Sequence, residues 1–149
     1  MPIRILIIND GRPGHANQSY GLLESFKQER DVTEEVIDIR YRVKAFRPLI
    51  NFFIKKNNLL GDILNSCFIK YSKKIDQRPD LIISSGGYTC ASSVVLARTF
   101  KTKNVFLGSP KGYPLSYFTL VISTSSLGPA RNNLVVDVMP QRFAGSEVR

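Results

Sequence analysis

The residues best suited to chemistry lie in two glycine-containing loops, each of which follows an apolar run. The first loop, residues 10–15 (DGRPGH), contains the only histidine of the chain. His15 stands where such folds place a general base or a binder of sugar hydroxyls, and the alternative is a histidine that only packs or caps the loop. Asp10 could orient His15 or simply stabilise the turn, and the turn is the favoured interpretation. These two residues are the candidates for catalysis.

The second loop, residues 84–89 (SSGGYT), joins a predicted strand to a predicted helix. Glycine permits positive φ and close backbone approach, and the helix that follows presents unpaired N–H groups, so a phosphate group is the natural ligand. The first loop has neither the GxGxxG pattern nor the Gly-Lys-Ser/Thr ending of a P-loop, and NAD or ATP binding in those modes is not supported. Ser85 or Thr89 could cap the helix or hydrogen-bond a ligand.

The sequence alternates between strand and helix patterns, and this alternation shows which predicted elements these two loops connect. Strands are predicted at residues 3–8, 32–39, 80–85, 104–107 and 118–122, with a further short one at 134–138. Helices are predicted at 15–29 and 88–100, and residues 43–75 form two more. Because a parallel crossover needs a helix-length connection, the alternation predicts one Rossmann-like α/β domain over residues 1–149. Its sheet is doubly wound and mainly parallel, has helices on both faces, and carries the functional loops at the carboxyl ends of its strands.

The composition limits the class of partner and the compartment. A formal charge of +9 favours anionic partners, but nucleic acid is disfavoured because no recognition helix or base-contacting aromatic loop is identifiable. Cys67 and Cys90 are predicted to be reduced, buried and structural, and no metal-ligand spacing surrounds them. The chain starts without a signal-peptide pattern, and its longest apolar run is too short to span a bilayer, so a cytoplasmic location is expected.

Residues 43–56 mix aromatic and aliphatic side chains with lysine and arginine and contain no acidic residue. Such a segment can lie in a membrane interface, or it can form a core helix with basic ends. In the first case the protein would be peripheral at the inner face of an anionic membrane. The surface residues would then be Arg47, Phe52, Phe53, Lys55 and Lys56.

Five segments resemble one known family. Residues 10–22 (DGRPGHANQSYGL) resemble the D-G-x-P-G-H-x-N-Q-x-x-G-L opening of the mitochondrial fission ELM family, whose bacterial members are often labelled predicted nucleoside-diphosphate-sugar epimerases. Residues 79–89 (PDLIISSGGYT) and 96–98 resemble its P-D-L-x-I-x-x-G-G-x-T strand and the helix after it, and residues 108–110 and 118–122 fit its later strand ends. The family's His-Asp pair after the later strand is replaced here by Ser-Thr-Ser-Ser at 123–126.

The family looks like the two-domain GT-B glycosyltransferases, and the resemblance implies that this chain is the N-terminal, acceptor-side half. The acceptor of such a half is often lipid-linked or membrane-borne, and a nucleotide-sugar donor would bind only if a C-terminal domain is supplied. No cofactor and no metal are implied. His15 would act as base or hydroxyl binder together with Asp10. The substrate-binding residues would be Gly11, Gly14, Asn17, Gln18, Ser85, Gly86, Gly87, Thr89 and Ser109.

Two other functions stay open. The protein could be a non-catalytic module for membrane-surface binding or recruitment, as the family's plant members suggest by their link to the mitochondrial division machinery. A nucleotide-sugar epimerase is disfavoured, because the Tyr-x-x-x-Lys pair and the dinucleotide fingerprint of the usual sugar epimerases are missing. An exposed apolar cleft face would also permit a homo-oligomer.

Overall fold

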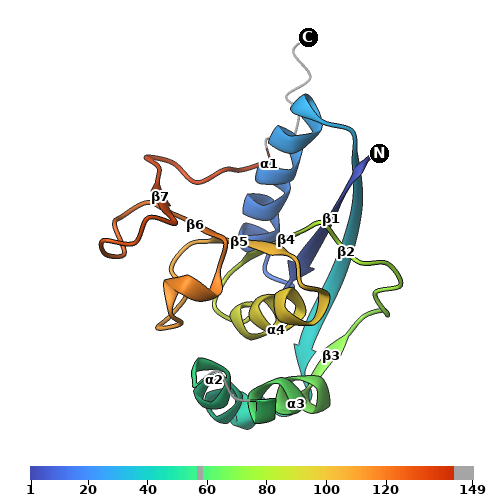
Figure 1. Ribbon diagram of the computed structural model, residues 1–149, viewed down its shortest axis with the longest axis vertical. Helices are drawn as coiled ribbons and strands as arrows, with labels where there is room; N and C mark the ends of the chain where they lie inside the picture. The colour runs from blue at the N-terminus through green and yellow to red at the C-terminus, as the bar shows by residue number, and fades with distance from the viewer. Residues whose placement is uncertain (57–58, 143–149) are drawn as a thin grey trace.

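The computed structural model describes residues 1–56 and 59–142 of the protein, and within them the strands form one seven-stranded sheet of order β3-β2-β1-β4-β5-β6-β7 (Figure 1). The strands are β1 (Ile3–Asn9), β2 (Val32–Tyr41), β3 (Ile69–Tyr71), β4 (Leu81–Ser85), β5 (Lys103–Leu107), β6 (Leu120–Ser123) and β7 (Asn133–Val135). The helices are α1 (Pro13–Glu29), α2 (Arg47–Lys55), α3 (Leu59–Phe68) and α4 (Cys90–Phe100), with short 3₁₀ turns at Lys44–Phe46 and Leu115–Tyr117.

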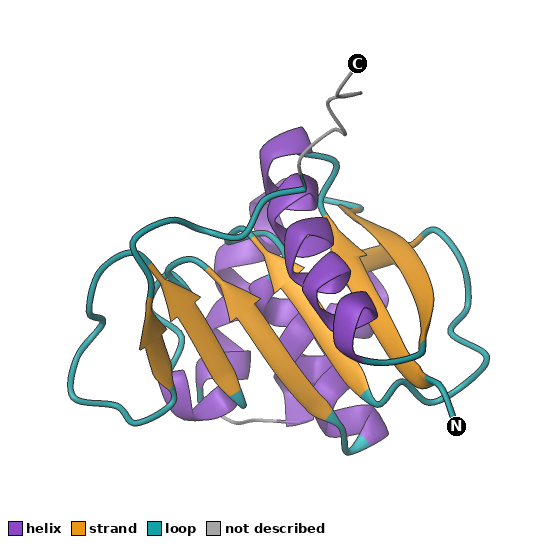
Figure 2. Cartoon of the chain, turned by 90° about the horizontal axis from the view of Figure 1, so that it is seen from above, coloured by secondary structure: helices purple, strands orange, loops and turns teal. Residues whose placement is uncertain are grey.

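The sheet is covered on both faces. Figure 2 shows α1 in front of the strands and the other helices behind them. On the α1 face, Ile5 and Ile7 pack with Leu23, whereas on the other face Leu6 and Ile8 belong to the cluster that α2 and α4 complete. This double burial explains why β1 is a continuous apolar run and not an alternating one. The predicted doubly wound α/β fold is confirmed.

The helical connections that leave the adjacent strands β1 and β4 run to opposite sides of the sheet. The chain leaves β1 through α1 to reach β2 on one side, and it leaves β4 through α4 to reach β5 on the other side, with all of these strands parallel. The two helices lie on opposite faces, so the loops after β1 and β4 diverge at the carboxyl edge of the sheet. This is the topological switch point, where α/β folds form their ligand crevice.

One strand and one cysteine differ from the sequence-based expectation. The sequence predicts residues 69–75 to be helical, but α3 ends at Phe68 and β3 pairs antiparallel with the end of β2. A strand of three residues is too short to leave a period-two pattern, and the buried Ile69 also fits a helical period. Cys90 is buried, but Cys67 is exposed, so the prediction of two buried cysteines was wrong for Cys67.

The segment after β7 returns across α1. Val136 and Met139 pack on the α1-side core, and the backbone N–H of Arg142 donates to the carbonyl of Asn17 at 3.1 Å. A Cβ on Gly21 would lie 2.4 Å from the backbone nitrogen of Gln141. The glycine in the middle of α1 therefore allows this crossing. No helix in the described part of the chain is long and apolar enough to cross a membrane.

Truncation of Phe106 tests the packing under α4. Its side chain is fully buried, and its ring centre lies 5.2 Å from that of Phe118. We expect Phe106→Ala to lower the free energy of unfolding by about 3–5 kcal/mol, because transfer and cavity terms add. Urea denaturation measures this, with Phe52→Ala, at a ring that is 54 % exposed, as the matched truncation. Equal losses for the two variants would show that Phe106 is not a core residue.

Candidate functional site

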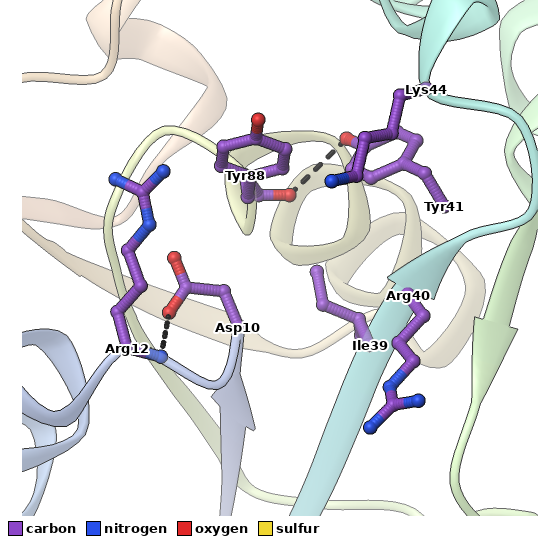
Figure 3. Close-up of a pocket in the computed structure, with 7 residues that line it drawn as sticks. All are labelled: Asp10, Arg12, Ile39, Arg40, Tyr41, Lys44 and Tyr88. Carbon is purple, nitrogen blue, oxygen red and sulfur yellow. Dashed lines mark hydrogen bonds between the residues drawn. The ribbon is translucent and has the colours of Figure 1, made fainter.

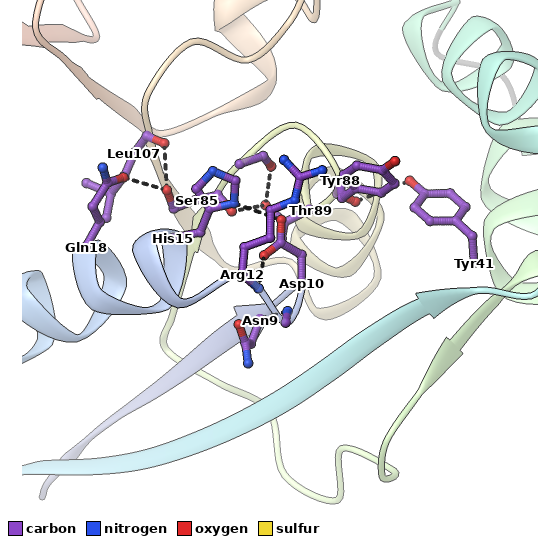
Figure 4. Close-up of polar contacts among 12 residues, drawn as sticks. Asn9, Asp10, Arg12, His15, Gln18, Tyr41, Ser85, Tyr88, Thr89 and Leu107 are labelled. Carbon is purple, nitrogen blue, oxygen red and sulfur yellow. Dashed lines mark hydrogen bonds and ion pairs between the residues drawn. The ribbon is translucent and has the colours of Figure 1, made fainter. Parts of the chain in front are cut away.

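The loop after β1 holds a histidine and a carboxylate in contact (Figure 4). His15 Nδ1 lies 2.8 Å from Asp10 Oδ2. The other carboxylate oxygen, Oδ1, accepts the backbone N–H of Arg12 at 3.0 Å. Only 2 % of the Asp10 side chain is exposed, compared with 29 % for His15. Asp10 thus stabilises the turn through one oxygen and orients the imidazole through the other.

This contact fixes which imidazole nitrogen can react. An ionised carboxylate only accepts hydrogen bonds, so Asp10 holds the proton on Nδ1 and leaves the lone pair on Nε2. Within the described residues, Nε2 has no hydrogen-bond partner. Nε2 is therefore available to accept a proton from a bound hydroxyl.

Gly86, directly after β4, lies against this pair. A Cβ at this position would be 2.2 Å from His15 Nδ1 and 2.9 Å from Asp10 Oδ2, so no other residue fits without displacing them. Gly86 also has a φ of +88°, which L side chains rarely adopt. The glycine is required on both counts, and it brings the loops of β1 and β4 into contact at the switch point.

The hydroxyl groups of Ser85 and Thr89, close to Gly86, form hydrogen bonds within the protein. Ser85 Oγ lies 2.7 Å from Gln18 Oε1 and 3.2 Å from the carbonyl of Leu107, which connects β4 to α1 and β5. Thr89 is fully buried and donates to the carbonyl of Gly86 at 2.8 Å. Thr89 is the residue before α4, yet its side chain makes no capping hydrogen bond to the helix. These residues hold the loop in shape.

The remaining predicted site residues are spread along the same edge. Gly11 and Gly14 have open space beside their Cα atoms, and Ser109 is exposed in the loop after β5. Asn17 contributes its carbonyl to the returning C-terminal segment. The structure therefore groups Asp10, His15, Gln18, Ser85 and Gly86, and within the described residues Ser109 makes no side-chain hydrogen bond to that group.

A pocket of about 330 Å³ opens next to the histidine loop, between the ends of β1 and β2 (Figure 3). Tyr41 donates a hydrogen bond to the carbonyl of Tyr88 at 3.2 Å across one wall of it. Three of the lining side chains are basic, and one is acidic. The polar and aromatic lining residues are Asp10, Arg12, Arg40, Tyr41, Lys44 and Tyr88.

Sequence reasoning missed Tyr88 and the cations around it. The guanidinium carbon of Arg12 lies 5.0 Å from the centre of the Tyr88 ring, and that of Arg47 lies 4.1 Å from it. Arg47 and Lys55 were predicted at a membrane surface, but both side chains reach this edge of the sheet. One sequence signal could have indicated these cations: a basic residue stands in a loop that follows a strand, as Arg12 does in DGRPGH.

Other members of the predicted membrane surface do face outward. Phe52 is 54 % exposed, and Lys56 Nζ lies 5.7 Å from its ring centre. Phe53 is only partly exposed. Within the described residues, no group of three His, Cys, Asp or Glu side chains could hold a metal ion.

The buried phenol of Tyr41 predicts a loss of stability at high pH. Burial raises the pKa of Tyr41 to about 12, and the nearby Arg47 acts in the opposite direction. A pKa raised above the unfolded value of 10.0 means that the stabilisation is complete below pH 10 and is lost as the pH rises towards 12. We expect urea midpoints to fall over this range, and less steeply in Tyr41→Phe. Because burial also raises the pKa of Cys90, some slope should persist. Identical slopes in both proteins would contradict the assignment.

Comparison with known proteins places the chain in a family. The model of the family described as Mitochondrial fission ELM1 matches residues 13–125, which include α1, the Gly86 loop and β6. No curated protein and no solved structure matches the chain. The resemblance identified in the sequence is confirmed over the matched residues, which are most of the described chain. The protein belongs to the mitochondrial fission ELM1 family.

Proposed function

We propose that this protein is the N-terminal, acceptor-binding domain of a GT-B-like glycosyltransferase that uses a nucleotide sugar and acts on a membrane-associated or lipid-linked acceptor. The observation that carries the proposal is the His15–Asp10 pair, held 2.8 Å apart and packed on Gly86 at the topological switch point. A partly exposed imidazole with a free Nε2 next to a pocket is the arrangement that proton removal from a hydroxyl requires.

The proposed reaction moves one proton and exchanges one bond. Nε2 of His15 takes the proton of the acceptor hydroxyl while that oxygen attacks the anomeric carbon of the sugar. The bond from the anomeric carbon to the phosphate oxygen breaks, and the nucleoside diphosphate leaves with the electron pair. Asp10 then stabilises the imidazolium through the Nδ1 hydrogen bond. In this proposal the nucleotide sugar is held by a second domain.

The outer surface of α2 and α3 supports a membrane-borne acceptor. The two helices lie side by side on the outside of the domain (Figure 1). Their exposed apolar side chains include Leu49 at 42 %, Phe52 at 54 % and Ile63 at 49 % exposure. Apolar side chains flanked by a lysine such as Lys56 are typical of helices that lie in an interface with anionic lipid.

The same surface favours a second candidate function, a non-catalytic module that recruits partners to a membrane. The name of the family, which refers to mitochondrial fission, agrees with such a role. The two functions differ in their use of His15. Recruitment needs the face of α2 and α3 but not a free imidazole nitrogen, whereas sugar transfer needs both.

Complementation of a gene deletion at the native locus tests the proposal, because it uses the protein as the cell makes it. Membranes from the deletion strain, the wild type and a His15→Ala strain are incubated with radiolabelled UDP-, GDP-, CMP- and ADP-sugars. We expect label from one donor to enter the lipid fraction in the wild type alone. Equal labelling in all three strains would overturn the transferase proposal, and loss of membrane attachment in Phe52→Glu with normal labelling in His15→Ala would favour recruitment.

A further inference from the structure

Four cations gather near the start of α4 without acidic partners. We call them the basic cluster: Arg12, Arg47, Lys55 and Lys111. They come from the loop after β1, from both ends of α2 and from the loop after β5. None of them forms an ion pair with an acidic residue in the described part of the chain. Like charges that converge in this way repel one another unless an anion lies among them.

Two of these side chains, those of Arg47 and Lys111, lie against Gly87. A Cβ at Gly87 would lie 3.0 Å from Cγ of Lys111 and 3.3 Å from Nη2 of Arg47. Lys55 lies beside Lys111, since its Nζ donates to the carbonyl oxygen of Lys111 at 3.4 Å. Because Gly87 has no side chain, Lys111 and Arg47 can pack directly against its backbone.

Arg47 has unused hydrogen-bonding capacity in this position. Its guanidinium stacks on Tyr88, and its Nε is buried with no hydrogen-bond partner in the described part of the chain. Burial raises the pKa of Cys90, the first residue of α4, to about 12, and the charges of Arg47, Lys55 and Lys111 act in the opposite direction. All three charges are therefore close to the first turn of α4.

We propose that the basic cluster binds a phosphate or diphosphate group of the acceptor. One guanidinium group can donate two parallel N–H hydrogen bonds to the oxygens of a phosphate, and each lysine adds a positive charge. Gly87 lets Arg47 and Lys111 pack close to the start of α4, whose dipole also favours an anion. In calling the ligand an acceptor, this inference rests on the proposed function, but the phosphate site can be tested without turnover.

The neighbouring glycine connects this site to the histidine. Gly86 lies against the His15–Asp10 pair, and Gly87 lies against Arg47 and Lys111. Adjacent Cα atoms are about 3.8 Å apart. A phosphate bound at the cluster would therefore hold the rest of the acceptor beside Nε2 and the pocket. The implied substrate class is a phosphorylated or diphosphate-linked hydroxyl compound.

Titration of the ¹⁵N-labelled protein with inorganic pyrophosphate tests the site directly. We expect saturable shifts of the backbone amide signals of Gly87 and Tyr88. The double variant Arg47→Gln with Lys111→Gln should weaken binding by about tenfold or more, because two charge-assisted contacts are lost. Lys103→Gln, which removes one positive charge at the amino end of β5, is the charge-matched control for Lys111→Gln alone and should bind as the wild type does. Lys111→Gln alone, at an exposed side chain, serves if the double variant unfolds.

Two results would overturn the phosphate site: amide signals that do not shift, or equal weakening by Lys103→Gln, which would show unspecific charge attraction. A second arm identifies the source of the phosphate. If the protein binds phosphatidic acid vesicles and pyrophosphate displaces them, the phosphate belongs to a lipid headgroup. If the protein binds pyrophosphate but not the vesicles, the ligand is a soluble phosphorylated compound. His15→Ala should bind pyrophosphate normally, so a failure of this site is separate from a failure of the transferase proposal.

Discussion

Replacing His15 with alanine should lower the rate of sugar transfer by about 10²- to 10⁴-fold, which is the usual contribution of a positioned general base. The imidazole is the only one in the chain, and its contact with Asp10 leaves Nε2 as the acceptor. Transfer is measured as the initial rate of label incorporation in membranes that carry the variant. Gln28→Ala, at an exposed position near the far end of α1, should keep the wild-type rate.

Asp10→Asn separates orientation from proton transfer. The amide can keep the contact with the Arg12 N–H, yet its NH₂ group no longer forces the proton onto His15 Nδ1. We expect a smaller loss than in His15→Ala, with normal pyrophosphate affinity. A rate unchanged in both variants would show that the pair only stabilises the turn, as the sequence alone favours for Asp10.

Replacing Gly86 with alanine should damage the site while His15 is still present. The new Cβ would lie 2.2 Å from His15 Nδ1, so the imidazole must leave its contact with Asp10. A φ of +88° is strained for alanine, and such residues cost about 1–3 kcal/mol. We expect a loss of unfolding free energy of about that size, together with a transfer rate as low as that of His15→Ala. Urea denaturation and the label assay measure the two effects.

Gly14→Ala provides the matched comparison for this variant. A Cβ on Gly14 would meet no neighbouring atom within 4 Å, and the φ of this residue is not positive. Alanine also suits the first turn of α1 better than glycine does, by up to about 1 kcal/mol. Stability should therefore be equal or higher. If Gly86→Ala and Gly14→Ala behaved alike, the close contact at Gly86 would not be what positions His15.

The fold was largely predictable because its central strands have a strong signal. β1, β4 and β5 are buried on both faces, which requires continuous apolar runs followed by turn-forming residues. β3 was missed because its pairing with β2 depends on where α3 ends, and Phe68 and Ile69 fit a helical period as well as a strand. The register between strands is a tertiary property that no single segment encodes.

The site was predictable only where its residues are neighbours in sequence. His15, Asp10 and the glycines stand in short loops after strands, and this placement already indicates chemistry at the carboxyl edge. The basic cluster could not be predicted in this way, because Arg47 meets Gly87 only after α2 packs near α4. Amphipathic periodicity places both Arg47 and Lys56 on a basic helix segment, but only packing decides which one turns inward.

The two adjacent glycines after β4 also restrict how the protein can evolve. Any side chain at Gly86 displaces the imidazole, and any side chain at Gly87 meets Lys111 and Arg47. A substitution at Gly86 therefore requires His15 to move, and a substitution at Gly87 requires the Lys111 and Arg47 side chains to shift. New acceptor preferences are more readily acquired through Gly14 or Ser109, where added atoms enter open space or an exposed loop. Gly86 and Gly87 are therefore the positions of the carboxyl edge that tolerate the least change, and the more open positions along this edge are where specificity can diverge.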